Sequence, residues 1–124
     1  MNSFRDFLEK YQQHLLILNY ADLTIENHDF YLNRFFAWLS HLDISDVTAI
    51  TKNHVMDYQT HLYEILNRHG EPTGPRTQNQ ALSIVKAFFR FLRENDYLAS
   101  DPPRDVAYAK VPKRLPRSIL SGSE

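Results

Sequence analysis

The sequence predicts an all-α protein, folded as a compact orthogonal bundle of four to five helices. Apolar residues recur at intervals of three and four along four segments, which is the spacing of one helix face. No segment of useful length alternates polar and apolar residues as a half-buried strand does. Short connections favour antiparallel neighbours, and the large aromatic residues on several segments favour irregular packing over a slim coiled-coil bundle.

Composition restricts the class of protein further. A chain of 124 residues with 43% hydrophobic residues can bury a core without covalent cross-links. The absence of cysteine excludes disulfides and thiolate chemistry and is compatible with a reducing compartment. No apolar run approaches the roughly 20 residues of a membrane span, and the N-terminus has no apolar core like that of a signal peptide. We therefore expect a cytoplasmic protein without membrane contact.

Helix-capping residues mark the first two helices. Ser3 is expected to cap the first, with Asp6 three residues later in a turn that favours acidic side chains. This helix is expected to end near Asn19. Thr24 is the N-cap candidate of the second helix, which runs to about Leu42. The residues expected to face the core are Phe4, Phe7, Leu8, Tyr11, Leu15 and Leu18 in the first helix, and Ile25, Leu32, Phe35, Phe36, Leu39 and Leu42 in the second.

A loop over residues 43–51 leads to the third helix. Within it, Val47 and Ile50 are expected to insert into the core. Thr51 is the N-cap candidate of a third helix that continues through Asn67. Residues 68–75, which follow, contain two glycines and two prolines, a composition that is expected to stop one helix and start the next.

The stretch from Thr73 to Asp96 predicts the fourth helix and has two distinct faces. One face is apolar, whereas the other carries positive and amide groups without any acidic residue. Solvated helix faces usually mix charge signs, so this face favours a phosphate backbone as partner, with Gln80 and Ser83 near enough to reach base edges. An ordinary solvated face remains the alternative. This face, here named the polar stripe, consists of Arg76, Gln80, Ser83, Lys86, Arg90 and Arg93.

Charge is divided unevenly along the chain, although the net charge is only -1. Residues 1–72 hold five basic and ten acidic residues, a net charge of -5, whereas residues 73–124 hold nine basic and five acidic residues, a net charge of +4. An anionic partner is therefore expected at the C-terminal part. Residues 97–98 are expected to fold back under the fourth helix, and residues 105–109 to form a short helical turn after a proline break.

No constellation of residues predicts catalysis or metal binding. The six histidines are scattered, and no pair has the spacing of zinc ligands on a helix. The carboxylates that lie close together in sequence occupy loops, where turn and cap roles account for them. No glycine-rich loop follows a strand, and no serine has a base nominated beside it. We expect no cofactor, no metal and no small-molecule substrate.

Tyrosines divide into two groups. Tyr31 lies between Asn27 and Arg34 on the polar flank of the second helix, where a phenol and a guanidinium could both reach a phosphate. A core or plain surface position is the alternative for Tyr31. Three other tyrosines fall on apolar stripes and are expected in the core with their hydroxyls at its rim: Tyr11, Tyr58 and Tyr97.

Three segments together resemble a known family. Residues 23–25 read Leu-Thr-Ile and open a helix that ends in RFFAWL at 34–39. Residues 81–92 read ALSIVKAFFRFL and are followed by NDYL at 95–98 and Asp-Pro at 101–102. The tail reads PKRLP at 112–116 and ILS at 119–121. In this order and spacing, the chain resembles the N-terminal core-binding (SAM-like) domain of phage integrases and other tyrosine recombinases of the Xer kind.

The resemblance implies a module that binds one face of a recombination half-site in double-stranded DNA. It implies a helical domain over residues 1–109 and a basic interdomain linker over 110–124, which leads to a catalytic domain absent from this chain. The nucleophilic tyrosine and its supporting residues belong to that domain, so this fragment is not expected to be an enzyme. The DNA-binding residues, from periodicity and resemblance together, are Thr24, Asn27, Tyr31, Arg34, Arg76, Thr77, Gln80, Ser83, Lys86, Arg90, Lys113 and Arg114.

The sequence also departs from the family. Family members often carry Tyr at the position of His28 and a basic residue at Asp29, and many carry arginines at Gln80 and Ala81. The surface around these four positions is therefore expected to carry less positive charge than in other members of the family. An alternative function is a helical protein-interaction module, which would bind an acidic partner or the acidic N-terminal half of a neighbouring protomer. Homo-oligomer contacts on DNA are compatible with both functions.

Overall fold

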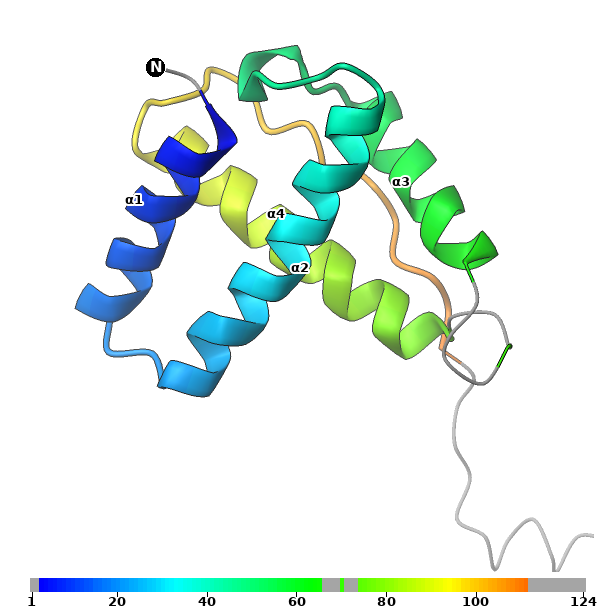
Figure 1. Ribbon diagram of the computed structural model, residues 1–124, viewed down its shortest axis with the longest axis horizontal. Coiled ribbons are helices and arrows are strands. Elements are labelled where there is room, and N and C mark those ends of the chain that lie inside the picture. Colours follow the sequence, from blue (N-terminus) through cyan, green and yellow to red (C-terminus); the bar gives the residue numbers. More distant parts are fainter. Residues whose placement is uncertain (1–2, 66–69, 71–73, 112–124) are drawn as a thin grey trace, which may run out of the picture.

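The computed structural model describes residues 3–65, 70 and 74–111, and within these it contains four α-helices and no extended strand. The predicted all-α class with four helices is confirmed. Figure 1 shows α1 and α2 side by side, with α4 running diagonally across them and α3 next to α4. The elements are α1 (Phe4–Ile17), α2 (Asp22–His41), a 3-10 turn η1 (Val47–Ala49), α3 (Lys52–Glu64) and α4 (Pro75–Glu94).

Helix α1 begins as the sequence predicts. The Ser3 hydroxyl accepts a hydrogen bond from the backbone N–H of Asp6 at 3.2 Å, which satisfies one of the free donors of the first turn. The helix ends at Ile17, two residues before the expected Asn19. Asn19 lies in the left-handed region with φ of 65°, a conformation that asparagine tolerates better than most residues.

Helix α2 begins earlier than predicted. Its first residue is Asp22, and Ala21 takes the N-cap position without any side-chain cap. The carbonyl of Ala21 accepts the first helical hydrogen bond, from Ile25 N–H at 3.1 Å. Thr24 therefore lies inside the first turn, and its predicted role as N-cap was wrong. The carboxylate of Asp22 at the first position suits the positive end of the helix dipole, which favours this earlier start.

Helix α3 has the predicted cap in an unusual form. The Thr51 hydroxyl accepts from His54 N–H at 3.3 Å, and His54 Nδ1 accepts from Thr51 N–H at 3.0 Å. A histidine thus takes the position that glutamate or glutamine usually has in a reciprocal capping box. The helix ends at Glu64, because Ile65 is the C-cap residue with an extended backbone (φ of -75° and ψ of 147°). The predicted continuation through Asn67, which itself lies outside the described residues, was therefore wrong.

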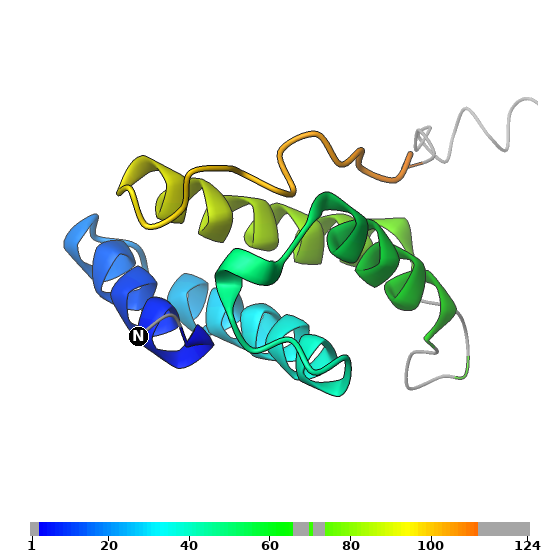
Figure 2. The same ribbon diagram turned by 90° about the horizontal axis from the view of Figure 1, so that it is seen from above.

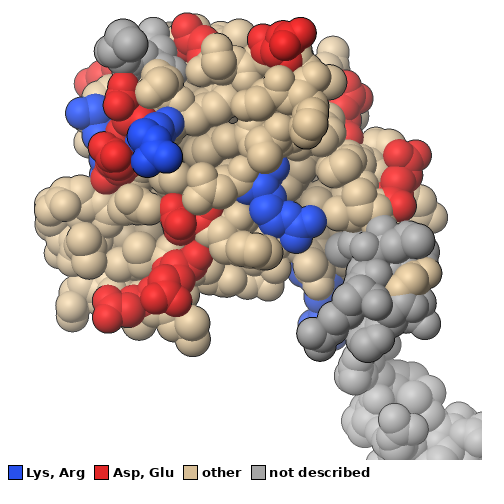
Figure 3. Space-filling view, in the orientation of Figure 1, with Lys and Arg blue, Asp and Glu red and all other residues tan. Residues whose placement is uncertain are grey.

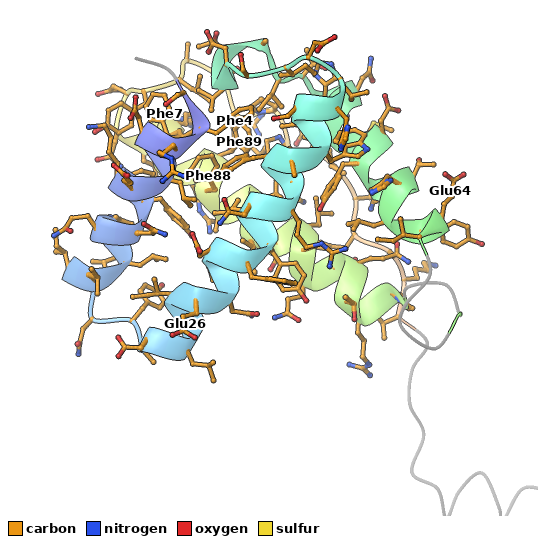
Figure 4. All side chains as sticks on the ribbon, viewed as in Figure 1. Phe4, Phe7, Glu26, Glu64, Phe88 and Phe89 are labelled. Carbon is orange, nitrogen blue, oxygen red and sulfur yellow. The ribbon has the colours of Figure 1, made fainter. Side chains whose placement is uncertain are left out.

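Aromatic side chains from all four described helices fill the core, where Phe4, Phe88 and Phe89 lie close together (Figure 4). Phe88 contacts Phe36 edge-on with ring centroids 5.5 Å apart, and edge-to-face contact is a favoured geometry for such pairs. Val47 and Ile50 are buried as predicted. The residues predicted to be buried that are instead exposed are Leu18 at 54%, Leu42 at 47% and Tyr97 at 39%.

Those exceptions share a cause. Leu18 and Leu42 are the C-cap residues of α1 and α2. Their backbone is no longer helical, so the helical spacing no longer predicts that their side chains face the core. Tyr97 keeps one side of its ring against Phe7, with centroids 5.3 Å apart. A helical periodicity carried past the end of the helix therefore places these side chains on the wrong side.

The segment after α4 folds back along it (Figures 1 and 2). As predicted for residues 97–98, the N–H groups of Tyr97 and Leu98 donate to the carbonyl of Leu92, at 2.8 and 3.2 Å. Residues 106–111 are not helical, which corrects the short helical turn expected over 105–109. A helix is unnecessary there because side chains of α3 and α4 satisfy the backbone groups.

Two amide side chains hold this returning segment. The Asn79 side chain donates to Ala109 C=O and accepts from Ala109 N–H, both at 2.8 Å. Gln59 of α3 donates to Ala107 C=O at 2.7 Å. Val106, which precedes these anchored residues, is buried. Residues 106–109 are therefore packed on the helices, while most of the predicted linker over 110–124 lies outside the described residues.

Candidate nucleic-acid interface

A groove of about 440 Å³ lies between α2 and α4. The spacing of the helical turns directs Thr24 and Asn27 of α2, and Gln80 and Ser83 of α4, toward this common space. The amides of Asn27 and Gln80 make no hydrogen bond with any described residue, whereas Ser83 Oγ donates to the Gln80 carbonyl at 3.1 Å. The residues that line it, here named the α2/α4 groove, are Leu23, Thr24, Asn27, His28, Gln80, Ser83 and Ile84.

The arginines of the polar stripe are exposed. Arg76, Arg90 and Arg93 form no ion pair with any acidic residue that the structure describes. The ion pair found within the described ranges is between Arg104 and Asp105, at 3.7 Å on the surface. These arginines therefore have no ion-pair partner among the described residues, although Arg90 and Arg93 lie close enough to Asp101 to affect its pKa.

Lys86 differs from the arginines of the stripe. Its ammonium lies 4.3 Å from the centroid of the Tyr108 ring, a cation–π contact made by the returning C-terminal segment. The side chain is half-buried as a result. Lys86 would have to leave Tyr108, or reach past it, to contact a phosphate. No sequence pattern indicates this contact, because the two residues are far apart along the chain.

A second hollow, of about 290 Å³, lies where the end of α4 meets the returning segment. Oδ1 of Asp101 is buried there without a hydrogen-bond partner. Burial raises the pKa of Asp101, and the positive charges of Arg104, Arg93 and Arg90 oppose this rise. Arg104 is a cation that the sequence analysis did not select, since no periodic pattern includes it. This basic hollow is lined by Lys86, Arg90, Arg93, Glu94, Asp101 and Arg104.

Two of the predicted residues lie farther along α2, toward α3. The guanidinium of Arg34 lies 5.5 Å from the ring centroid of Phe30, and Tyr31 is half-buried against the core. Burial raises the pKa of Tyr58 in α3 to about 12, with Arg34 lowering it and Tyr31 raising it. These interactions place both residues near α3, and neither lines the α2/α4 groove.

The other predicted residues are not in the groove either. Arg76 and Thr77 are exposed in the first turn of α4, and Arg90 lines the basic hollow. Lys113 and Arg114 lie outside the described residues. The structure thus brings together Thr24, Asn27, Gln80 and Ser83 in one groove, with Lys86 and Arg90 beside it in the second hollow.

His28 is a groove residue that the sequence analysis noted only as a departure from the family. Its Nδ1 lies 2.9 Å from the hydroxyl of Tyr11 on α1. Burial lowers the pKa of His28, so the neutral imidazole is favoured. Burial also raises the pKa of the Tyr11 phenol far above its usual value, with a smaller rise from Tyr20 and an opposing effect of Arg90.

Acidic side chains lie mainly elsewhere. On the face shown in Figure 3, red acidic residues lie at the top and right edges and in a band across the left-hand part, and Figure 4 places Glu26 and Glu64 on α2 and α3. This distribution agrees with the charge imbalance of the sequence, in which residues 1–72 carry a net charge of -5.

Within the described ranges, no group of three or more His, Cys, Asp or Glu residues is arranged to hold a metal ion. The same residues include no helix both long enough and apolar enough to cross a lipid bilayer.

Comparison with known proteins gives relatives of one kind. The chain is 28% identical over 118 residues to tyrosine recombinase XerC 2 of Ralstonia nicotianae, a match that covers 95% of this chain and 34% of the relative. The chain therefore spans about a third of the length of this curated relative. The family described as phage integrase, N-terminal SAM-like domain, matches residues 7–98.

Two solved structures share the fold. The N-terminal domain of a phage integrase/site-specific recombinase from Haloarcula marismortui superposes with a TM-score of 0.71 at 24% identity, covering 86% of this chain and 96% of that one. The integrase from mycobacterium phage Brujita gives a TM-score of 0.69 at 14% identity, covering 89% of this chain and 34% of that one. With the four-helix fold and the matched residues 7–98, these findings establish that the chain belongs to the phage integrase N-terminal SAM-like domain family.

Proposed function

We propose that this chain is the DNA-binding module of a site-specific tyrosine recombinase, which grips one face of a recombination half-site. A catalytic domain outside this chain would cleave and rejoin the DNA strands. The observation that carries the proposal is the set of unpaired arginines beside the α2/α4 groove. Arg90 and Arg93 form no ion pair with any described residue, and the neighbouring amides of Asn27 and Gln80 have unused hydrogen-bonding groups.

The arrangement suits duplex DNA because it separates two tasks. The arginines supply charge, which holds the phosphate backbone without regard to sequence. The α2/α4 groove supplies hydroxyl and amide groups, which can donate to base edges or accept from them. Amides that bind both a donor and an acceptor are well suited to adenine, whereas arginine prefers guanine or phosphate.

A titration of the 124-residue chain with a duplex of random sequence tests the proposal. We expect a dissociation constant of about 1–100 µM near physiological salt, as is typical of nonspecific DNA binding. Backbone NMR signals should shift in α2 and α4, with α1 and α3 as internal controls. Shifts confined to α1 and α3, or no binding at low salt, would contradict the proposal.

The alternative is a protein-interaction module that docks an acidic partner on the same basic surface. The net charge of -5 over residues 1–72 favours a neighbouring protomer as that partner. Sedimentation of the chain with and without duplex DNA separates the two functions. Self-association in the absence of DNA, with no shift on adding duplex, would support the alternative and exclude the proposed DNA-binding role.

A further inference from the structure

His28 occupies a position between the core and the α2/α4 groove. On one side its Nδ1 contacts the Tyr11 hydroxyl at 2.9 Å, and the two rings are 5.8 Å apart. On the other side the residue lines the groove beside Thr24 and Asn27. When one ring nitrogen of a histidine is hydrogen-bonded within the protein, that bond determines whether the other nitrogen is a donor or an acceptor for a ligand.

The Tyr11 hydroxyl determines which kind it is. Tyr11 is buried, and the resulting rise in the pKa of its phenol keeps it protonated at neutral pH. A protonated phenol beside a neutral imidazole can either donate to an unprotonated Nδ1 or accept from an Nδ1–H group. The first arrangement is the stronger one, because an unprotonated imidazole nitrogen accepts a hydrogen bond better than a phenol oxygen does. In it, His28 Nδ1 is the acceptor and the ring proton is on Nε2.

Nε2 has no acceptor within the part of the chain that the structure describes. The groove residues Thr24, Asn27, Gln80 and Ser83 carry no charge. His14 stacks on Tyr11 with ring centroids 6.4 Å apart. Arg90 and Tyr20 act on Tyr11 from α4 and from the turn after α1. Among the described residues, no acidic side chain is paired with His28, so no negative charge next to it stabilises the protonated imidazolium form.

We propose that His28 is a sequence-reading residue, which donates a hydrogen bond from Nε2–H to an acceptor on a DNA base edge. Base-edge acceptors in the major groove are purine N7, guanine O6 and thymine O4. A neutral donor gains less from a phosphate than the exposed arginines do, whereas base reading depends on a donor in a fixed orientation. This inference rests on the proposed DNA-binding function and adds to it one residue and one kind of contact.

Two substitutions separate the donor from the rest of the side chain. His28→Gln places an amide N–H close to the position of Nε2 and so keeps the donor in the groove. His28→Asn places its amide near the position of Nδ1, facing Tyr11, and leaves the groove without a donor. The pair is matched in polarity and charge, so a difference between them reports on the donor at Nε2.

The experiment is selection of preferred duplexes from a randomised pool by the 124-residue chain and its variants. We expect the wild type and His28→Gln to favour the same base pair at one position, and His28→Asn to lose about fivefold or more of that preference. Binding to the unselected pool should stay unchanged. A preference identical in all three proteins, or a loss that is equal for all sequences, would overturn the assignment of His28 as a base reader.

A second measurement does not depend on the variants folding. Nitrogen-15 spectra of the histidine rings in the wild type should show His28 as the Nε2–H tautomer, and its Nε2 signal should move when a selected duplex is added. Protonation at Nδ1, or an Nε2 signal unaffected by bound DNA, would overturn the inference. Arg90→Ala is included in the same series. If it weakens binding to the unselected pool while the His28 variants keep the wild-type preference, the DNA-binding function is supported and only the role of His28 is rejected.

Discussion

Replacing Arg90 by alanine is the most direct test of the electrostatic part of the interface. Arg90 is exposed, lies on the α4 side of the basic hollow, and has no acidic partner among the described residues. Its removal therefore breaks no ion pair within the described structure, although it also removes a positive charge that acts on Asp101 and Tyr11. Its effect on folding should be small, within about 0.5 kcal/mol, as for most surface substitutions.

The magnitude follows from counting unpaired cations. If Arg76, Arg90 and Arg93 each neutralise one phosphate, the slope of log K against log salt concentration is about −2.7. Arg90→Ala should reduce the slope to about −1.8. Between about 50 and 200 mM salt, the affinity deficit of the variant should therefore shrink roughly 3.5-fold.

Fluorescence anisotropy with a labelled duplex measures this slope, and Arg5→Ala is the matched control. Arg5 is an equally exposed cation, but it lines a different hollow between α1 and α2. Its loss changes the net charge by the same amount and should leave the slope near the wild-type value. Parallel salt dependence for wild type and Arg90→Ala, or equal changes in both variants, would refute the assignment of the phosphate contact to α4.

Three further predictions concern stability and the returning segment. Phe89→Ala removes a fully buried ring from the core and should lower the free energy of unfolding by about 3–5 kcal/mol in urea titrations; a loss below about 1 kcal/mol would contradict the packing described. Asn79→Ala removes both hydrogen bonds to Ala109, so amide exchange at Ala109 should accelerate at least about fivefold, while exchange in the middle of α2 stays unchanged; equal rates at Ala109 would contradict the anchoring. Burial lowers the pKa of His28, so its contribution to stability is complete above the unfolded value near pH 6.5 and is lost as pH falls toward the lower folded value. Thermal melts should show this loss in the wild type and not in His28→Gln; identical pH profiles would contradict it.

Local patterns in the sequence predicted most of the helices. The periodicity of α4 and the cap at Thr51 were confirmed because both depend on residues within one or two turns of each other. The start of α2 was wrong because Thr24 is a good cap by type, yet Ala21 and Asp22 satisfy the first turn without it. The preference of threonine for N-cap positions therefore predicted the helix correctly but placed its first residue too late.

Contacts between distant segments could not be predicted in this way. Tyr108 covers Lys86, and Asn79 binds Ala109, because the chain reverses after α4. The turn that causes this reversal has no periodic signal. The pairing of His28 with Tyr11 is similar, since it depends on how α1 packs on α2. The sequence thus predicted candidate DNA-binding residues on two helices. Only the packing of these helices shows which of the residues share the α2/α4 groove.

The pairing of Asn79 with Ala109 also limits how far from the domain a segment that follows residue 111 can extend. It seats the returning chain near the first turns of α4, so that any polypeptide continuing beyond residue 111 departs from a defined point on the domain. Detachment of residues 101–111 would lengthen such a tether by up to about 35 Å. The effective concentration of whatever is tethered falls steeply as the tether grows, so the contacts of Asn79 and Gln59 with residues 107–109 would set how closely a tethered segment is held to this domain.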